Sequence, residues 1–269
     1  MDSHKKEVIV TIVCAVCVAV TAVVSAVIAR QSVTTYQYQV KCVPSFENVA
    51  ATDYFPLQPG NRWVYEGTAR NDTEQGTVVK RKVRVVMRVV DVTRSGSALL
   101  FTMEGHPSDA AWALKATDAS EDVVEVRPST YGYLVVANKV FRIPQERLGD
   151  VRRAIEDGGF LKPGLISQND LEFEFPLFTG QVFGTPHQMA RSDRSYAWHV
   201  TDITPYYPPG RQKGKVARGG LRLVYVTRPD RTEALFVPYV GLASFSYNHH
   251  GTIAQVDIHL HDYRVHVQR

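Results

Sequence analysis

Cysteine is scarce in this chain, and neither sign of charge dominates. Only three of the 269 residues are cysteine, and two of them lie inside a long apolar run. Cys42 is the one cysteine in the rest of the sequence, which excludes a disulfide within that part. The 31 basic and 27 acidic side chains nearly balance. The composition therefore gives no support to a nucleic-acid partner, which would require a basic surface.

Signatures of well-known catalytic and nucleotide sites are missing. The sequence contains neither a G-x-S-x-G nucleophile elbow nor an H-E-x-x-H zinc helix. Residues 210–215 read G-R-Q-K-G-K and are similar to a phosphate-binding loop. One spacer residue is lacking, however, and Val216 stands where Ser or Thr would be required. The motifs therefore assign no reaction and no catalytic residue.

The apolar run predicts a membrane anchor. Val8–Ala29 contains no charged residue and follows Lys5 and Lys6. As a helix it would be about 33 Å long, enough to cross a hydrocarbon core of about 30 Å. A cleaved signal peptide is the alternative, but the apolar part of such a peptide is typically about 7–15 residues long. The two lysines favour a single pass with a cytoplasmic N-terminus.

The rest of the chain is expected outside the cytoplasm, in the periplasm or the extracellular space. Residues 31–52 are polar and show no sustained period, which is typical of a tether. The predicted organisation is an anchor at 1–30, a tether at 31–52 and one extracytoplasmic β domain at 53–269.

The domain shows mostly the period-two alternation of β-strands. In the clearest predicted strand, 77–93, Val83, Val85 and Met87 lie on one face, with Arg84 and Arg88 on the other. The other predicted strands are 62–69, 97–104, 112–117, 122–127, 131–137, 171–175, 196–203, 221–228, 233–237, 243–247 and 253–267. One short helix is predicted at 145–156, after a proline and before two glycines. The expected fold is mostly β, an antiparallel curved sheet that forms a half-barrel or open barrel.

A nine-residue pattern occurs twice. The pattern F-P-L-x-x-G-x-x-aromatic fits Phe55–Trp63 and, 120 positions later, Phe175–Phe183. In each copy the proline ends one segment, the glycine permits a turn and the last aromatic begins a strand facing the core. We interpret the pattern as a turn that is used twice, and duplication of a larger unit is the alternative.

The first copy is part of a longer motif. Residues 53–65 read D-Y-F-P-L-Q-P-G-N-R-W-V-Y, which resembles the opening motif of uncharacterised exported bacterial proteins and lipoproteins. Residues 238–242, P-Y-V-G-L, are similar to their late P-G-V-G-L segment, with Tyr239 in place of Gly, and a closing hairpin follows. The resemblance covers both ends of the domain and not its middle. It implies a half-barrel similar in broad shape to periplasmic lipoprotein carriers, with an apolar concavity and no catalytic residue.

Histidine is concentrated near the C-terminus. Alternation places Asp257, His259 and His261 on one face of the last predicted strand. With a fourth ligand from His249 or His250, these residues could bind Zn²⁺ or Cu²⁺. A solvated strand face is the alternative. The alternation slips near residue 262, which predicts a β-bulge there.

Three functional hypotheses follow from the sequence. The leading one is a non-catalytic module without a cofactor, which presents an apolar concavity to a lipid, lipoprotein or other envelope partner. The aromatic residues expected in or near the concavity are Trp63, Tyr65, Phe101, Trp112 and Phe183, although they could equally form a sealed core. The second hypothesis is a metal-dependent envelope enzyme that uses zinc at the histidine cluster. The third is a structural component of the envelope.

Overall fold

The computed structural model describes residues 51–72, 78–111, 123–157, 165–209, 218–250 and 254–266. The predicted anchor, the tether up to residue 50, the predicted strand at 112–117 and Trp112 lie outside these ranges. Within them, no helix is both long and apolar enough to span a membrane.

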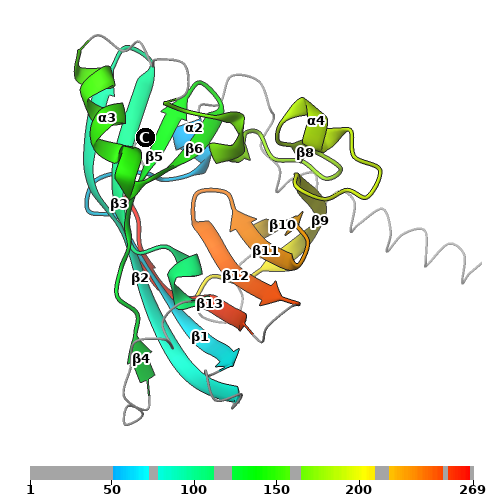
Figure 1. Ribbon diagram of the computed structural model, residues 1–269. Helices are drawn as coiled ribbons and strands as arrows, with labels where there is room; N and C mark the ends of the chain where they lie inside the picture. The colour runs from blue at the N-terminus through cyan, green and yellow to red at the C-terminus, as the bar shows by residue number, and fades with distance from the viewer. Residues whose placement is uncertain are drawn as a thin grey trace, which may run out of the picture. The chain divides into compact units, whose positions relative to one another are not determined.

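One antiparallel sheet dominates the domain and curves into a nearly closed barrel shape, so the mostly β prediction is confirmed (Figure 1). Its strand order is β7-β6-β5-β3-β2-β1-β13-β12-β11-β10-β9-β8, and β4 pairs with β2 in parallel. The first seven strands are β1 (Arg62–Asp72), β2 (Val78–Ser95), β3 (Ala98–Glu104), β4 (Val123–Glu125), β5 (Thr130–Val136), β6 (Lys139–Pro144) and β7 (Leu171–Glu174). The others are β8 (Val182–Phe183), β9 (Trp198–Tyr206), β10 (Arg218–Val226), β11 (Asp230–Val237), β12 (Gly241–His249) and β13 (Ala254–Arg264).

Short helices complete the described fold. The predicted helix is present as α3 (Gln145–Glu156). The prediction of a single helix was incomplete, because α2 (Ala51–Tyr54), α4 (Pro186–Met189) and the 3₁₀ helices η1 (Pro107–Ala111) and η3 (Gln168–Asp170) also form. Each has at most five residues, too few to show a helical period in the sequence.

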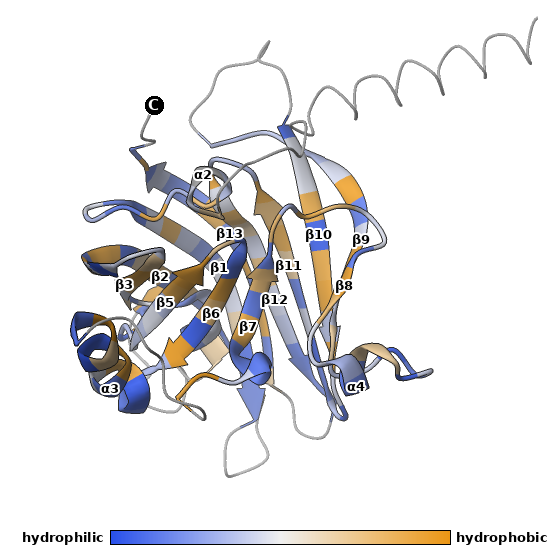
Figure 2. Cartoon of the chain, turned by 90° about the horizontal axis from the view of Figure 1, so that it is seen from above, coloured by the Kyte–Doolittle hydropathy of each residue, from blue (hydrophilic) through white to orange (hydrophobic). Residues whose placement is uncertain are grey.

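The alternation in the sequence determines which side chains face the core. On β2, Val83, Val85 and Met87 are at most 1% exposed, while the arginines between and after them reach solvent. Along β10, a polar band lies between two apolar bands (Figure 2). On β13, the register with β1 shifts between Leu260 and Asp262. The predicted bulge is therefore confirmed, with His261 as the extra residue.

Two strands of the structure are not among the predicted strand ranges. β6 follows β5 after a two-residue turn at Ala137 and Asn138. Ala137 has a φ of 54°, a left-handed conformation for which Gly or Asn is the usual residue, so the sequence contained no clear turn signal. β8 has only two residues, too few for an alternating pattern. The second copy of the nine-residue pattern did predict a strand facing the core at Phe183, which is the buried last residue of β8.

Two hydrophobic clusters lie on opposite faces of the first part of the sheet. The main core contains Phe55, whose ring contacts Trp63, Phe173 and Phe236 edge to face at centroid distances of 5.6–6.2 Å. A smaller cluster packs α3 against β3, β5 and β6 and includes Leu148 and Val151 (Figure 1).

The sheet consists of two consecutive six-stranded meanders. Strands β1, β2, β3, β5, β6 and β7 are neighbours in chain order, and so are β8 to β13. Each meander begins with one copy of the F-P-L-x-x-G-x-x-aromatic pattern. Pairing of β1 with β13 joins the two meanders. The pattern thus marks the start of a whole meander as well as a turn.

The two ends of the sheet, β7 and β8, meet without strand pairing in the part of the chain that the structure describes. Side chains bridge this seam instead. Gln181 Nε2 donates to the Glu174 carbonyl (2.7 Å), and Gln168 Nε2 donates to the Gly184 carbonyl (3.3 Å). β8 ends before Gly184, whereas β1, its counterpart in the first meander, continues to Asp72. The seam therefore stays open beside β7.

Candidate functional site

A cavity of about 670 Å³ lies at the seam between β7 and β8. Its lining comes from both meanders. The first meander supplies Ser108, Asp109, Ser129, Thr130, Tyr131, Arg142, Pro144, Gln145, Glu146, Arg147, Gln168, Asn169, Asp170, Leu171 and Glu172, and the second supplies Phe183, Gly184, Gln188, Tyr196, Trp198 and Tyr225. Pockets of about 300–1,000 Å³ are typical of small-molecule sites. This volume is therefore sufficient for a ligand.

The short helix η1 positions the inner polar groups. Gly105 has a φ of 71°, and a Cβ at this position would lie 2.0 Å from the Val86 carbonyl oxygen, so the turn from β3 into η1 requires glycine. His106 then caps the helix: its Nδ1 accepts from the Ser108 N–H (3.1 Å), and its own N–H donates to Asp109 Oδ2 (2.9 Å). These reciprocal bonds are similar to a capping box, with His in place of Ser or Thr and with the N–H of the second helical residue as the donor to the cap side chain.

Asp109 also fixes the start of β5. Its carboxylate accepts hydrogen bonds from the Ser129 N–H (2.9 Å) and from the Ser129 hydroxyl (2.8 Å). One carboxylate thus joins η1 to the segment before β5, across 20 residues.

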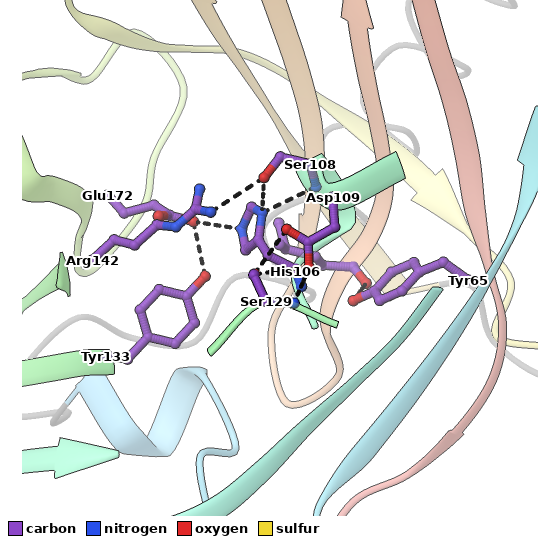
Figure 3. Close-up of polar contacts among 9 residues, drawn as sticks. Tyr65, His106, Ser108, Asp109, Ser129, Tyr133, Arg142 and Glu172 are labelled. Atoms are coloured by element: carbon purple, nitrogen blue, oxygen red, sulfur yellow. Dashed lines mark hydrogen bonds and ion pairs between the residues drawn. The ribbon is translucent and has the colours of Figure 1, made fainter. Parts of the chain in front are cut away.

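The His106 imidazole contacts β7 through its other nitrogen (Figure 3). Because Nδ1 accepts a backbone N–H, the proton of the neutral ring is on Nε2, which lies 3.3 Å from Glu172 Oε1. The Tyr133 hydroxyl donates to the same oxygen (2.9 Å). The His106 and Glu172 side chains are only 3% and 12% exposed, so this polar row is buried.

The surroundings of the row shift both pKa values downward. Burial lowers the pKa of His106 below 6.5, and the charge of Arg142 acts in the same direction, against the contact with Glu172. Burial by itself raises the pKa of Glu172. The hydrogen bonds from His106 and Tyr133 and the charge of Arg142 outweigh burial and leave this pKa below 4.5. At neutral pH the row therefore contains a neutral imidazole and a carboxylate.

Arg142, on β6, presents a guanidinium to the cavity. Its Nη2 donates to Ser108 Oγ (3.2 Å), and its Cζ lies 5.2 Å from the centroid of the Tyr131 ring. Among the described residues, no carboxylate oxygen comes within ion-pair distance of this guanidinium. Within the described ranges, its Nε and Nη1 donate no hydrogen bond. By contrast, Arg147 forms a two-point ion pair with Asp170, at 2.6 and 2.9 Å.

Aromatic side chains form the other side of the cavity. The Trp198 ring stacks on Phe183, with centroids 6.4 Å apart and planes at 21°, and it lies 5.1 Å from the Tyr225 ring. Trp198 and Tyr225 are partly exposed, while Phe183 is fully buried. The cavity therefore has a polar side with an open guanidinium and an aromatic side.

The contacts of Ser108, His106 and Glu172 have the connectivity of a nucleophile, a base and an orienting acid. Ser108 Oγ lies 2.7 Å from His106 Nδ1. The same Nδ1 accepts the Ser108 N–H, however, as the side chain of a helix cap does, and the contact of His106 with Glu172 belongs to the buried polar row. We assign no catalytic step to them.

The structure places the predicted concavity residues in the interior. Trp63, Tyr65 and Phe183 are 0% exposed, and Phe101 is 3% exposed. Trp63 Nε1 and the Tyr65 hydroxyl donate to the carbonyls of Val240 and Leu242. Phe183 contributes to the lining of the seam cavity. Trp112 lies outside the described residues.

The predicted metal ligands are spread over the sheet. His259 lies 3.4 Å from Asp257, His261 lies 3.3 Å from Glu66, and His249 pairs with Asp230. His259 pairs in register with Ser244, five positions along β12 from His249, which corresponds to about 17 Å. His250 is in the turn after β12.

In the described ranges, no group of three or more His, Cys, Asp or Glu side chains is arranged to hold a metal ion. Metal binding at this cluster stays a prediction. His249 lies too far from His259 to bind the same ion.

The sequence analysis missed His106, Arg142, Glu172 and Trp198. No local period marks Glu172, which contacts His106 across 66 residues. A signal was present in H-P-S-D at 106–109, which has a carboxylate three positions after a possible cap residue.

No family model matches the sequence, and no curated protein matches it. Among solved structures, the chain is similar to a protein from Bacteroides fragilis described as exported and as having a YmcC-like fold (TM-score 0.40, 11% identity, 80% of this chain and 100% of that chain). It is also similar to a protein from Parabacteroides distasonis described as a lipoprotein (TM-score 0.35, 9% identity, 81% and 100%). Neither likeness identifies a ligand or an activity.

Proposed function

We propose that this protein is a non-catalytic binding module, held at the outer face of a membrane by residues 1–30, whose ligand enters the cavity at the β7–β8 seam. The observation that carries the proposal is the open guanidinium of Arg142. Buried charges are normally paired, because desolvation of a lone charge is costly. The Arg142 guanidinium lies near the carboxylates of Glu172 and Asp109, but it forms no ion pair with a described residue and donates one hydrogen bond, to Ser108, so it can still bond to a ligand.

The cavity chemistry favours a polar ligand, or the polar part of a larger envelope partner, over an acyl chain. The aromatics expected to form an apolar concavity are packed in the core, between 0% and 3% exposed for Trp63, Tyr65, Phe101 and Phe183. The seam cavity instead contains charged, amide and hydroxyl side chains on one side. A lipid tail would desolvate these groups without bonding to them.

A metal-dependent enzyme at Asp257, His259 and His261 is the second candidate. It is favoured by one observation, the placement of all three side chains on the exposed face of β13. The third candidate function is a purely structural role in the envelope.

Native mass spectrometry of the full-length chain tests the proposal. The protein is purified without a histidine tag from its own host and kept in detergent. We expect a retained small-molecule mass in the wild type that is lost in Arg142→Gln and kept in the matched variant Arg222→Gln, whose side chain lies outside the cavity. A bare chain in every preparation would contradict the proposal. A metal mass lost in the His259→Ala/His261→Ala variant would favour the enzyme.

A further inference from the structure

We propose that the ligand of the seam cavity is an uncharged saccharide, one face of whose sugar ring lies on Trp198 while its hydroxyl groups bond to Arg142 and the polar side chains around it. The inference rests on the proposed function and adds the chemical class of the ligand. A sugar ring has C–H groups on its faces and hydroxyls around its rim, so it needs an aromatic surface on one side and hydrogen-bonding groups on the other.

The aromatic side of the cavity supplies such a surface. Trp198 packs against Phe183 and Tyr225, and these contacts limit the movement of its ring. Its partly exposed surface belongs to the cavity lining. An aromatic ring that is fixed before binding loses little side-chain entropy when a ligand stacks on it.

The polar side supplies fixed donors and acceptors. Arg142 is oriented by its bond to Ser108 and by the Tyr131 ring, and its Nε and Nη1 donate no hydrogen bond to a described residue. The amide side chains are also held in place: Gln188 Nε2 donates to Asn169 Oδ1 (3.2 Å), and both residues line the cavity. Planar groups of this kind can bond to two neighbouring hydroxyls of one sugar.

The charges around Arg142 favour an uncharged ligand. The carboxylates of Glu172 and Asp109 are close enough to act on the Arg142 guanidinium, and they would repel an anionic ligand at the same point. Both carboxylates already accept hydrogen bonds within the protein, as does Asp170. The fourth carboxylate of the lining, Glu146, accepts no hydrogen bond from a described residue, but it is exposed to solvent, where an ion pair with a cationic ligand contributes little. Neutral hydroxyl groups can accept hydrogen bonds from the Arg142 guanidinium. They are not repelled by the carboxylates, and they do not require an ion-pair partner.

A glycan array followed by ligand-observed NMR tests the inference. The probe is the full-length chain in a detergent without a sugar head group, because alkyl glycosides would compete for the cavity. The array contains neutral, uronic-acid and amino-sugar oligosaccharides. We expect binding to the neutral glycans only. In NMR, saturation transfer to the best neutral glycan should be strongest at the C–H groups of one ring face.

Matched variants locate the site. We expect Trp198→Ala and Arg142→Gln each to weaken glycan binding at least tenfold. Trp198→Phe should retain most of the binding. The controls Tyr207→Ala and Arg222→Gln should change the affinity less than twofold. Tyr207 is 71% exposed and does not line the cavity. Circular dichroism checks the fold of each variant. If Arg142→Gln does not fold, a second measurement takes the place of this variant. Neutral glycan is added to the wild type, and the chemical shift of the Trp198 indole N–H is followed.

Absence of binding to every neutral glycan, or binding to acidic or amino glycans alone, would overturn the inference. The native mass spectrum separates this failure from failure of the proposed function. A retained mass that is not a saccharide leaves the binding module standing with another ligand, whereas a bare chain contradicts both.

Discussion

Gly60 and Gly180 adopt the same backbone conformation, each with a φ of 88°, although 120 positions separate them. Their hydrogen bonds also correspond. Gly60 N–H donates to the Val89 carbonyl (3.0 Å) and Gly180 N–H to the Val200 carbonyl (2.8 Å). The two glycines thus hold equivalent turns at the start of the two meanders.

Substitution of Gly60 or Gly180 should lower the free energy of unfolding by similar amounts. No heavy atom lies within 4 Å of a Cβ built at either position, so the penalty comes only from the positive φ, about 1–2 kcal/mol. We expect Gly60→Ala and Gly180→Ala to lower the free energy of unfolding by that amount in urea denaturation. Gly149→Ala, in α3 and also without close neighbours, should raise it by up to about 1 kcal/mol. Equal losses for all three would contradict a conformational cause.

Asn61 should be a major determinant of closure between the meanders. It is fully buried, and its amide donates to the carbonyls of Pro56 (2.6 Å) and His266 (3.2 Å) while accepting the His266 N–H (2.8 Å). Asn61→Ala leaves these groups unpaired, and we expect a loss of about 2–4 kcal/mol. Asn138→Ala removes one bond, to the Phe175 carbonyl, and should cost about 1 kcal/mol. A smaller loss for Asn61→Ala than for Asn138→Ala in thermal unfolding would refute this role.

Acid should destabilise the fold through His106. Its folded pKa lies below 6.5 because burial, and then the charge of Arg142, disfavour the imidazolium, while Glu172 and Asp109 oppose this shift. As pH falls below about 6.5, the unfolded chain binds a proton that the folded chain does not. The free energy of unfolding should therefore decrease with falling pH until the folded pKa is reached.

The variant His106→Asn tests this pH dependence, because Asn can cap η1 without titrating. We expect a shallower slope in this pH window. The slope should not vanish, since burial also lowers the pKa of His199. An unchanged slope would show that His106 does not contribute. His106→Leu, which removes the cap as well, should be less stable than His106→Asn at neutral pH by about 1 kcal/mol.

Any metal site on β13 should be independent of His249. If Zn²⁺ binds in calorimetric titrations, we expect His259→Ala/His261→Ala to abolish binding and His249→Ala to leave the dissociation constant unchanged, because His249 pairs with Asp230 elsewhere on the sheet. Loss of binding in His249→Ala would show that the strands rearrange around the ion. Chelator treatment that lowers the melting temperature of the wild type alone would support a structural ion.

Much of the local structure could be predicted from the sequence. The alternation around Val83 and Val85 predicted β2 and its buried face, the slip near Asp262 predicted the bulge, and the spacing after Pro144 predicted α3. These features depend on neighbouring residues, since each strand or helix exposes one face to water and buries the other.

Only the tertiary structure decided the arrangement of the strands and the residues of the cavity. His106 meets Glu172 across 66 residues, and Arg142 meets Ser108 across 34. No local period encodes such contacts, because they depend on which strands become neighbours and on where β8 ends. The sequence by itself thus determined the strands and their buried faces. The open seam, with its guanidinium and aromatic surface, arises from long-range packing that brings the ends of two meanders together.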